Sequence, residues 1–228
     1  MINNYYQFIK DLRLAKNLAQ AEVAEKIGVS RSSYIAFEQG KVELSLREAG
    51  KLADLFGITL EEMKMELRPN YDKYKEMILE CLRFGSSADG KIPKTKLAKL
   101  LYLADFAWFY EKLTSMSGMQ YRRLSYGPVP DMYFRALDEL EGAGKIVIDR
   151  EKNGLLLIKE SDGNAQQKLT LLDAEEKRLI KAIGKKWLGK KTEEIVNFTH
   201  NQMPYSICHE NEIIPYELIT QENPDNIY

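Results

Sequence analysis

Two absences narrow the class of protein first. Only two cysteines occur in 228 residues, Cys81 and Cys208, and they lie far apart. This spacing does not suggest a disulfide framework, and we expect both thiols to be buried and reduced. No apolar run approaches the roughly 20 residues that span a bilayer, and residues 1–12 lack the apolar core and cleavage site of a secretory signal. We therefore expect a cytoplasmic protein with no membrane partner.

An excess of charge of either sign is also missing. The 33 lysines and arginines face 34 aspartates and glutamates, which gives a formal net charge of -1. General affinity for nucleic acids requires a basic surface. Any DNA binding must therefore depend on the local placement of charges and helix N-termini.

Catalytic and metal-binding patterns are scarce as well. Cys208 and His209 are adjacent and His200 lies near them, but no third group or oxyanion-hole motif accompanies these residues. Their spacing matches no structural zinc pattern, and no phosphate-cradling glycine loop occurs. We predict a protein that is not an enzyme and holds no metal or cofactor.

The clearest positive signal is the stretch from Gln20 to Lys41. Gly28 is suited to the left-handed position that ends a helix, and Ser30 can cap the next one. Apolar residues recur at helical spacing on both sides of Gly28, at Val23, Ala24, Ile27, Tyr34 and Phe37. The stretch therefore predicts two short helices joined by a tight turn, each with one face buried.

The second of these helices has the features of a DNA recognition helix. Its outer face, where the base edges of a major groove could be met, carries Arg31, Ser32, Ser33 and Ala36. The motif resembles the helix-turn-helix of the Cro and lambda-type repressors, the XRE family. That resemblance implies that Gln20 bonds a phosphate and braces the recognition helix. Arg31 can form a fork of hydrogen bonds to guanine, and Lys41 is placed for a phosphate.

The flanking segments complete the expected five-helix domain, residues 1–67, before a linker at 68–70. An amphipathic helix over 5–16 precedes the motif. Ser45 and Glu48 form a capping box that opens a fourth helix ending at Gly57, and a second box at Thr59 opens a fifth toward Leu67.

Acidic residues share this domain, at Glu22, Glu25, Glu38, Glu43 and Glu48. They would repel phosphates if they faced the duplex. A homodimer that spans two half-sites would compensate for weak monomer binding. A module that has lost DNA binding and serves only for dimerisation is the alternative.

The remainder predicts a second domain, residues 71–219, with a flexible tail at 220–228. Its expected helices cover 71–83, 94–112, 131–141, 173–187 and 192–201. The helix 94–112 is apolar on every face, so we expect it at the centre. A short strand at 121–125 leads into a rigid turn at 126–130, and an Asn-Gly turn joins a hairpin of 146–149 with 155–159. The fold class is therefore mainly α, with an α+β second domain of winged-helix type.

A second resemblance rests on three segments: residues 99–106, KLLYLADF; residues 126–130, YGPVP, with Tyr133 and Leu137; and residues 214–217, IPYE. Together they are similar to the SocA-like antitoxin domain, also called Panacea. The resemblance implies an antitoxin that binds a cognate protein toxin, in an operon that the helix-turn-helix represses. Some relatives instead act as adaptors that deliver the toxin to an ATP-dependent protease.

The toxin surface is expected around the exposed parts of Tyr102, Asp105, Tyr126, Pro128 and Tyr133. Asp105 is the strongest candidate, because a carboxylate in so apolar a helix is costly unless it bonds something. The rival interpretation is a transcription regulator whose second domain senses a ligand or dimerises. A basic run between Lys177 and Lys191 fits either function, or simply a solvated helix face.

Overall fold

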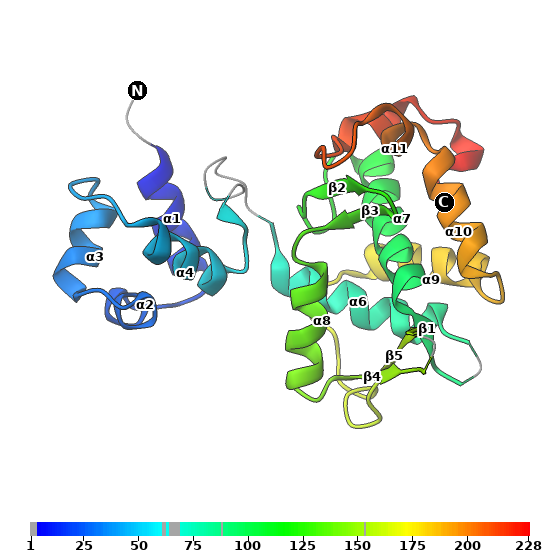
Figure 1. Ribbon diagram of the computed structural model, residues 1–228, viewed down its shortest axis with the longest axis horizontal. Coiled ribbons are helices and arrows are strands. Elements are labelled where there is room, and N and C mark those ends of the chain that lie inside the picture. Colours follow the sequence, from blue (N-terminus) through cyan, green and yellow to red (C-terminus); the bar gives the residue numbers. More distant parts are fainter. Residues whose placement is uncertain (1–3, 61–62, 64–68, 88, 153) are drawn as a thin grey trace. The chain divides into compact units, whose positions relative to one another are not determined.

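The computed structural model describes residues 4–60, 63, 69–87, 89–152 and 154–228 (Figure 1). Their contacts divide the chain into two compact units, Met1–Pro69 and Asn70–Tyr228. The described residues are mostly helical, with small antiparallel sheets in the second unit, so the expected fold class is confirmed. Among the described residues, no helix combines the length and apolar character needed to cross a membrane.

The first unit is built from short helices with well-defined ends. As far as the structure describes them, they are α1 (Asn4–Ala15), α2 (Gln20–Ile27), α3 (Arg31–Glu38) and α4 (Leu46–Phe56). Gly28 ends α2 at φ 83°, the left-handed region that favours glycine. The Ser30 hydroxyl accepts a hydrogen bond from Ser33 N at 3.0 Å. The fifth helix expected from Thr59 to Leu67 falls largely outside the described residues.

The core of this unit is one cluster shared by its helices. Its buried members are Phe8, Ile9, Val23, Ala24, Ile27, Tyr34, Phe37, Leu52, Ala53, Phe56, Ile58 and Met63. The residues whose spacing predicted the two-helix motif are all among them. Burying a large apolar side chain contributes roughly 1.5 to 3 kcal/mol. This cluster therefore fixes α2 against α3.

The second unit surrounds one helix. Its helices are α6 (Tyr71–Gly85), α7 (Lys94–Lys112), α8 (Tyr133–Gly142), α9 (Ala174–Trp187), α10 (Thr192–Asn201) and α11 (Met203–Ile207), with 3-10 turns η1 (Tyr216–Gln221) and η2 (Pro224–Asn226). Every residue of α7 from Lys96 to Trp108 is buried. The expectation of a central helix is confirmed, and Figure 1 shows α7 among the other elements of this unit.

Two antiparallel sheets complete the unit. One has the strand order β1-β5-β4, from β1 (Ile92–Pro93), β5 (Leu156–Glu160) and β4 (Ile146–Arg150), with Ile158 paired to both Ile92 and Ile148. The predicted pairing of 146–149 with 155–159 is thus confirmed, while Asn153 of the expected turn lies outside the described residues. The pattern did not predict β1, because a strand of two residues is too short to show alternation.

The second sheet corrects an expectation. Residues 126–130 were expected to form a rigid turn into a helix, but β3 (Gly127–Pro130) pairs with β2 (Tyr121–Leu124). Pro128 and Pro130 occupy alternate positions of this strand, which turns both nitrogens to the same side. A strand at the edge of a sheet tolerates such prolines.

The flexible tail expected at 220–228 is also wrong. Ile227 is 4% exposed, and the Gln202 side-chain amide donates to the carbonyls of Asn226 at 2.6 Å and Ile227 at 2.9 Å. The side chain of Ile227 anchors this mostly polar segment. Composition alone does not reveal that anchor.

Candidate functional site

The recognition helix α3 presents its predicted positions outward. Arg31, Ser32, Ser33 and Lys41 are exposed, and Ala36 is half-buried. The hydroxyl of Ser30 lies 2.9 Å from that of Ser32 and 2.7 Å from that of Ser33. The first turn of α3 contains no acidic side chain, so the positive end of the helix dipole is not neutralised there. The arrangement can accept phosphates, and contact with bases stays a prediction.

A buried ion pair holds α3 in place. Glu38 accepts from Arg13 Nε at 2.7 Å and from Gln20 Nε2 at 2.7 Å, which joins α1, α2 and α3. Burial raises the pKa of Glu38, but the hydrogen bonds from Arg13 and Gln20 outweigh it, so the pKa lies below its usual value. Gln20 is therefore positioned to brace the recognition helix, and its phosphate contact stays a prediction.

Most acidic neighbours of α3 have partners within the unit. Glu48 accepts from Ser45 N at 2.7 Å and its own amide donates to the Ser45 hydroxyl at 3.3 Å, which completes a capping box. Glu22 accepts from Ala19 N at 2.6 Å, but alanine has no side-chain acceptor, so only half of such a box forms. Glu43 accepts from the Tyr6 hydroxyl at 3.2 Å, and Glu25 is exposed on α2. The carboxylates of Glu22, Glu43 and Glu48 thus stabilise helix ends and helix contacts within the unit.

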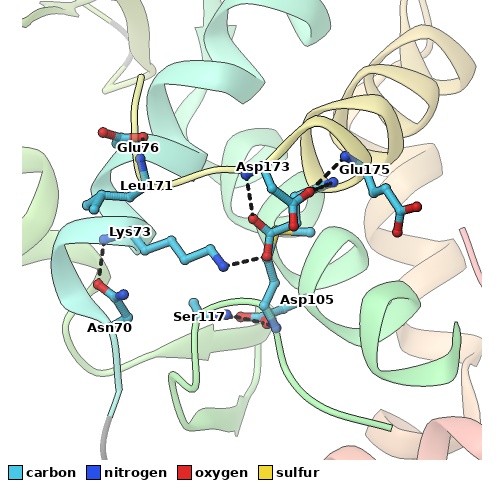
Figure 2. Close-up of polar contacts among 10 residues, drawn as sticks. Asn70, Lys73, Glu76, Asp105, Ser117, Leu171, Asp173 and Glu175 are labelled. Carbon is cyan, nitrogen blue, oxygen red and sulfur yellow. Dashed lines mark hydrogen bonds and ion pairs between the residues drawn. The ribbon is translucent and has the colours of Figure 1, made fainter. Parts of the chain in front are cut away.

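Asp105 lies at the centre of the second unit and bonds the chain itself. It is 0% exposed, and its carboxylate accepts from Met116 N at 2.8 Å, from Ser117 N at 3.0 Å and from the Ser117 hydroxyl (Figure 2). Burial raises its pKa, and these hydrogen bonds oppose the rise. The expectation that Asp105 faces a toxin is wrong, because the loop after α7 takes up the hydrogen-bonding capacity that made it a candidate.

Three further candidates for the toxin surface are buried. Tyr102 is 0% and Tyr133 is 1% exposed, and Pro128 is buried within β3. The Tyr102 ring packs 4.3 Å from that of Phe106, and the Tyr133 hydroxyl donates to Lys94 O at 2.7 Å. The expectation of exposed parts on these three is wrong, since aromatic and proline residues in this motif form core and strand. Tyr126, 48% exposed, remains at the surface.

Other charged groups fasten α6 to α9 (Figure 2). Lys73 pairs with the buried Glu176, which together with Asp173 closes the capping box of α9. Glu76 accepts from Thr170 N at 3.0 Å and Leu171 N at 2.8 Å. The basic run after Lys177 is mostly exposed, as a solvated helix face requires.

A cavity of about 310 Å³ opens between α7, the β2–β3 hairpin and α8. It is lined by Lys94, Thr95, Ala98, Lys99, Tyr126, Val129, Tyr133 and Phe134. Lys94 Nζ lies 4.9 Å above the Phe134 ring. No acidic side chain is among these described lining residues.

Lys99 is the unusual member of that lining. It is 0% exposed, and its ammonium donates to Pro128 O at 3.3 Å. Within the described part of the chain, no carboxylate forms an ion pair with it, and burial lowers its pKa to about 7. Gly127, at φ 105°, makes room for it, because a Cβ there would lie 2.4 Å from Lys99 Nζ. Sequence reasoning missed Lys99, although a lysine inside an all-round apolar helix is a usable signal.

The two cysteines are free and buried, as expected, and burial raises the pKa of Cys81. His200 stacks on Tyr205 with ring centroids 4.3 Å apart. Among the described residues, no group of three or more histidines, cysteines or acidic side chains could hold a metal ion.

Comparison with known proteins assigns each unit separately. A helix-turn-helix family model matches residues 9–63, and the model of the SocA-like antitoxin, Panacea domain, matches residues 97–205. The chain is 37% identical over 77 residues to the cryptic phage CTXphi transcriptional repressor RstR of Vibrio cholerae, which covers 32% of this chain and 69% of that protein. An uncharacterized HTH-type transcriptional regulator of Methanocaldococcus jannaschii is 44% identical over 55 residues, 24% of this chain and 83% of the relative. No solved structure matches the chain.

Proposed function

We propose that this chain neutralises a cognate protein toxin by direct binding. The chain belongs to the helix-turn-helix transcriptional regulators and carries a SocA-like Panacea domain after its DNA-binding domain. The observation that carries the proposal is the match of the antitoxin model to residues 97–205 in the same chain as the helix-turn-helix. The chain is thus a DNA-binding, antitoxin-type regulator. We assign neutralisation to residues 71–219 and place the protein in the cytoplasm.

The burial of the motif residues divides their roles. Asp105, Tyr102 and Tyr133 shape the second unit from within, whereas Tyr126 can touch a partner. We therefore place the toxin contact at the turn between β2 and β3, around the exposed Tyr126, and not on α7. A protein interface is commonly anchored by a few aromatic side chains, and an exposed tyrosine at a rigid hairpin suits that role.

Repression of the chain's own operon is the second part of the proposal. The exposed Arg31 and the uncompensated N-terminus of α3 support operator binding. A reporter fused to the chain's own promoter should be repressed by the full chain, and equal expression with and without the chain would contradict this part. A homodimer spanning two half-sites would double the contacts.

Co-expression tests the neutralisation. Each gene adjacent to this one is expressed alone and then together with the full chain, and we expect one neighbour to arrest growth alone and to be tolerated with the chain. If no neighbour is both toxic alone and rescued, the antitoxin proposal fails. Rescue that requires an ATP-dependent protease would instead identify an adaptor.

The two units supply matched controls for that experiment. Residues 70–228 should rescue growth without repressing the promoter, because these residues form a compact unit of their own. Residues 1–69 should not rescue. Rescue by the full chain only would place part of the toxin site in the first unit.

A regulator with a ligand-sensing second domain is the runner-up. The cavity lined by Lys99 and Tyr126 is the observation in its favour. Absence of rescue together with ligand-dependent repression would favour it.

A further inference from the structure

The cavity between α7, the β2–β3 hairpin and α8 combines apolar walls with a buried lysine. Its walls are apolar, from Ala98, Val129, Tyr133 and Phe134, yet Lys99 is buried at one side. Isolated burial of an ammonium is costly, and buried cations are normally paired with a carboxylate. In the described residues Lys99 has one carbonyl partner, Pro128 O, and no carboxylate acts on its ammonium.

Lys96, on the same helix, is also buried, but its ammonium has hydrogen-bond partners. The Lys96 ammonium donates to Trp187 O at 2.8 Å and to Lys190 O at 2.6 Å, at the end of α9. Carbonyls at a helix C-terminus carry partial negative charge, so Lys96 is compensated. Lys99, by contrast, is among the residues that line the cavity, and within the described residues its one hydrogen bond is the 3.3 Å contact with Pro128 O.

Several groups around Lys99 favour an anion. Lys94 stands at the exposed side of the cavity, and Lys94 and Thr95 form the first turn of α7, which has no side-chain cap. His200 lies beside Gly127, and its Nε2 atom is buried with no partner within the described residues. Burial, and then the charges of Lys99 and Arg123, lower the pKa of His200. The positive charge next to the apolar wall is therefore that of Lys94 and, below its pKa, that of Lys99, with no acidic side chain among the described lining residues.

We propose that this cavity binds a carboxylate attached to an apolar body, with the Lys99 ammonium as the anion's partner and Tyr133 and Phe134 against the apolar part. One negative charge matches the single buried lysine. The volume of about 310 Å³ suits a group the size of an aromatic side chain. The carboxylate can be that of a free acid or the C-terminus of a protein chain, which share this chemistry.

Binding of small probes to the full chain tests the site without any toxin. We expect 3-phenylpropionate to bind at pH near 6, where Lys99 is charged, with a dissociation constant of about 1 mM, and its neutral amide to bind at least about tenfold more weakly. The signal is the nuclear magnetic resonance of His200. The chain has two histidines, and His209, which is exposed, serves as the internal reference that should not shift.

Three variants separate the site from general effects. Lys99→Met keeps the side-chain volume and should weaken acid binding by about tenfold or more while leaving amide binding unchanged. Lys96→Met, the matched buried lysine outside the cavity, should bind the acid as the unmodified chain does. Lys94→Gln at the exposed side should weaken acid binding about threefold and provides the test if Lys99→Met does not fold.

A peptide arm identifies the source of the carboxylate. Tighter binding of a short peptide ending in phenylalanine with a free C-terminus than of 3-phenylpropionate assigns the site to a protein chain end, and the reverse order assigns it to a free acid. The proposal is overturned if acid and amide bind alike, if Lys99→Met leaves acid binding unchanged, or if neither probe shifts His200. The measurement needs no toxin, so its failure would leave the antitoxin proposal standing, and failed rescue would leave the site standing.

Discussion

The two units handle charged side chains in opposite ways. In the first, charged groups stay near the surface, where they cap helices or, like Arg31, point outward, and the largely buried Arg13 is paired with Glu38. In the second, Lys99 and Asp105 are fully buried on α7, and within the described residues their hydrogen bonds go to backbone groups or a hydroxyl and not to an opposite charge. In the first unit, an exposed charged residue such as Arg31 is therefore a candidate for the functional surface. In the second unit, charged residues divide between internal scaffolding and a cavity.

Removing Asp105 should break the second unit most severely. Asp105→Ala leaves the amides of Met116 and Ser117 buried without an acceptor, at about 1 to 3 kcal/mol for each such group. We expect a loss of about 2 to 4 kcal/mol in the free energy of unfolding, measured by urea denaturation. The exposed Asp162→Ala should change it by less than about 0.5 kcal/mol. Equal stability of both variants would refute the scaffolding role.

The pH dependence of stability sharpens the contrast between Lys99 and Asp105. The folded pKa of Lys99, about 7, lies below the unfolded value of about 10.4. Between these values the unfolded chain holds a proton that the folded chain lacks, so stability rises with pH. The cost of burying the charged Lys99 ammonium is therefore complete below the folded pKa, and it disappears as the pH rises toward the unfolded pKa.

The free energy of unfolding of Lys99→Met should therefore exceed that of the unmodified chain by less as the pH rises. Between about pH 7 and 9 its advantage in unfolding free energy should shrink by about 2 kcal/mol. The quantity compared is the difference in unfolding free energy between Lys99→Met and the unmodified chain. Burial also raises the pKa of Cys81, which makes stability fall with rising pH in both proteins, and this effect cancels in the difference. An exposed lysine replaced in the same way, Lys185→Met, should show a constant difference. A constant difference for Lys99→Met as well would mean that Lys99 is not buried as a titrating group.

Arg31→Ala tests the other side of the comparison, with the smallest effect on the folded state. Operator affinity should fall by about 1 to 3 kcal/mol, with relaxed preference at one base position, if the guanidinium forks onto guanine. Unfolding free energy should change by less than about 0.5 kcal/mol, since Arg31 is exposed. Electrophoretic mobility shifts with single-base operator variants measure the effect. Lys41→Ala is the control, because loss of a phosphate contact weakens all sequences alike.

The local signals in the sequence predicted much of the fold. The Ser45–Glu48 box and the left-handed Gly28 act within one helical turn, and the structure has both. The helix 94–112 was predicted to its last residue. The pattern missed β3, because two prolines one residue apart indicate a turn unless a partner strand is known.

The candidate site was predicted unevenly. Side-chain direction on α3 follows from helical period alone, so the exposure of Arg31 was foreseeable. On α7 the period carries no such information, since its whole middle is buried. Tyr102 and Asp105 were therefore assigned to a surface they do not reach, and Lys99 was overlooked.

By itself, the sequence determined the elements whose physics is local: helix caps, glycine turns, the amphipathic faces of the first unit and the central apolar helix of the second. Only the tertiary structure decided which charges on that helix are satisfied. Asp105 and Lys99 lie six positions apart with similar neighbours in sequence, yet one meets backbone amides folded over it and the other meets a cavity. Burial and partners are set by segments distant in the chain, and no local pattern encodes them.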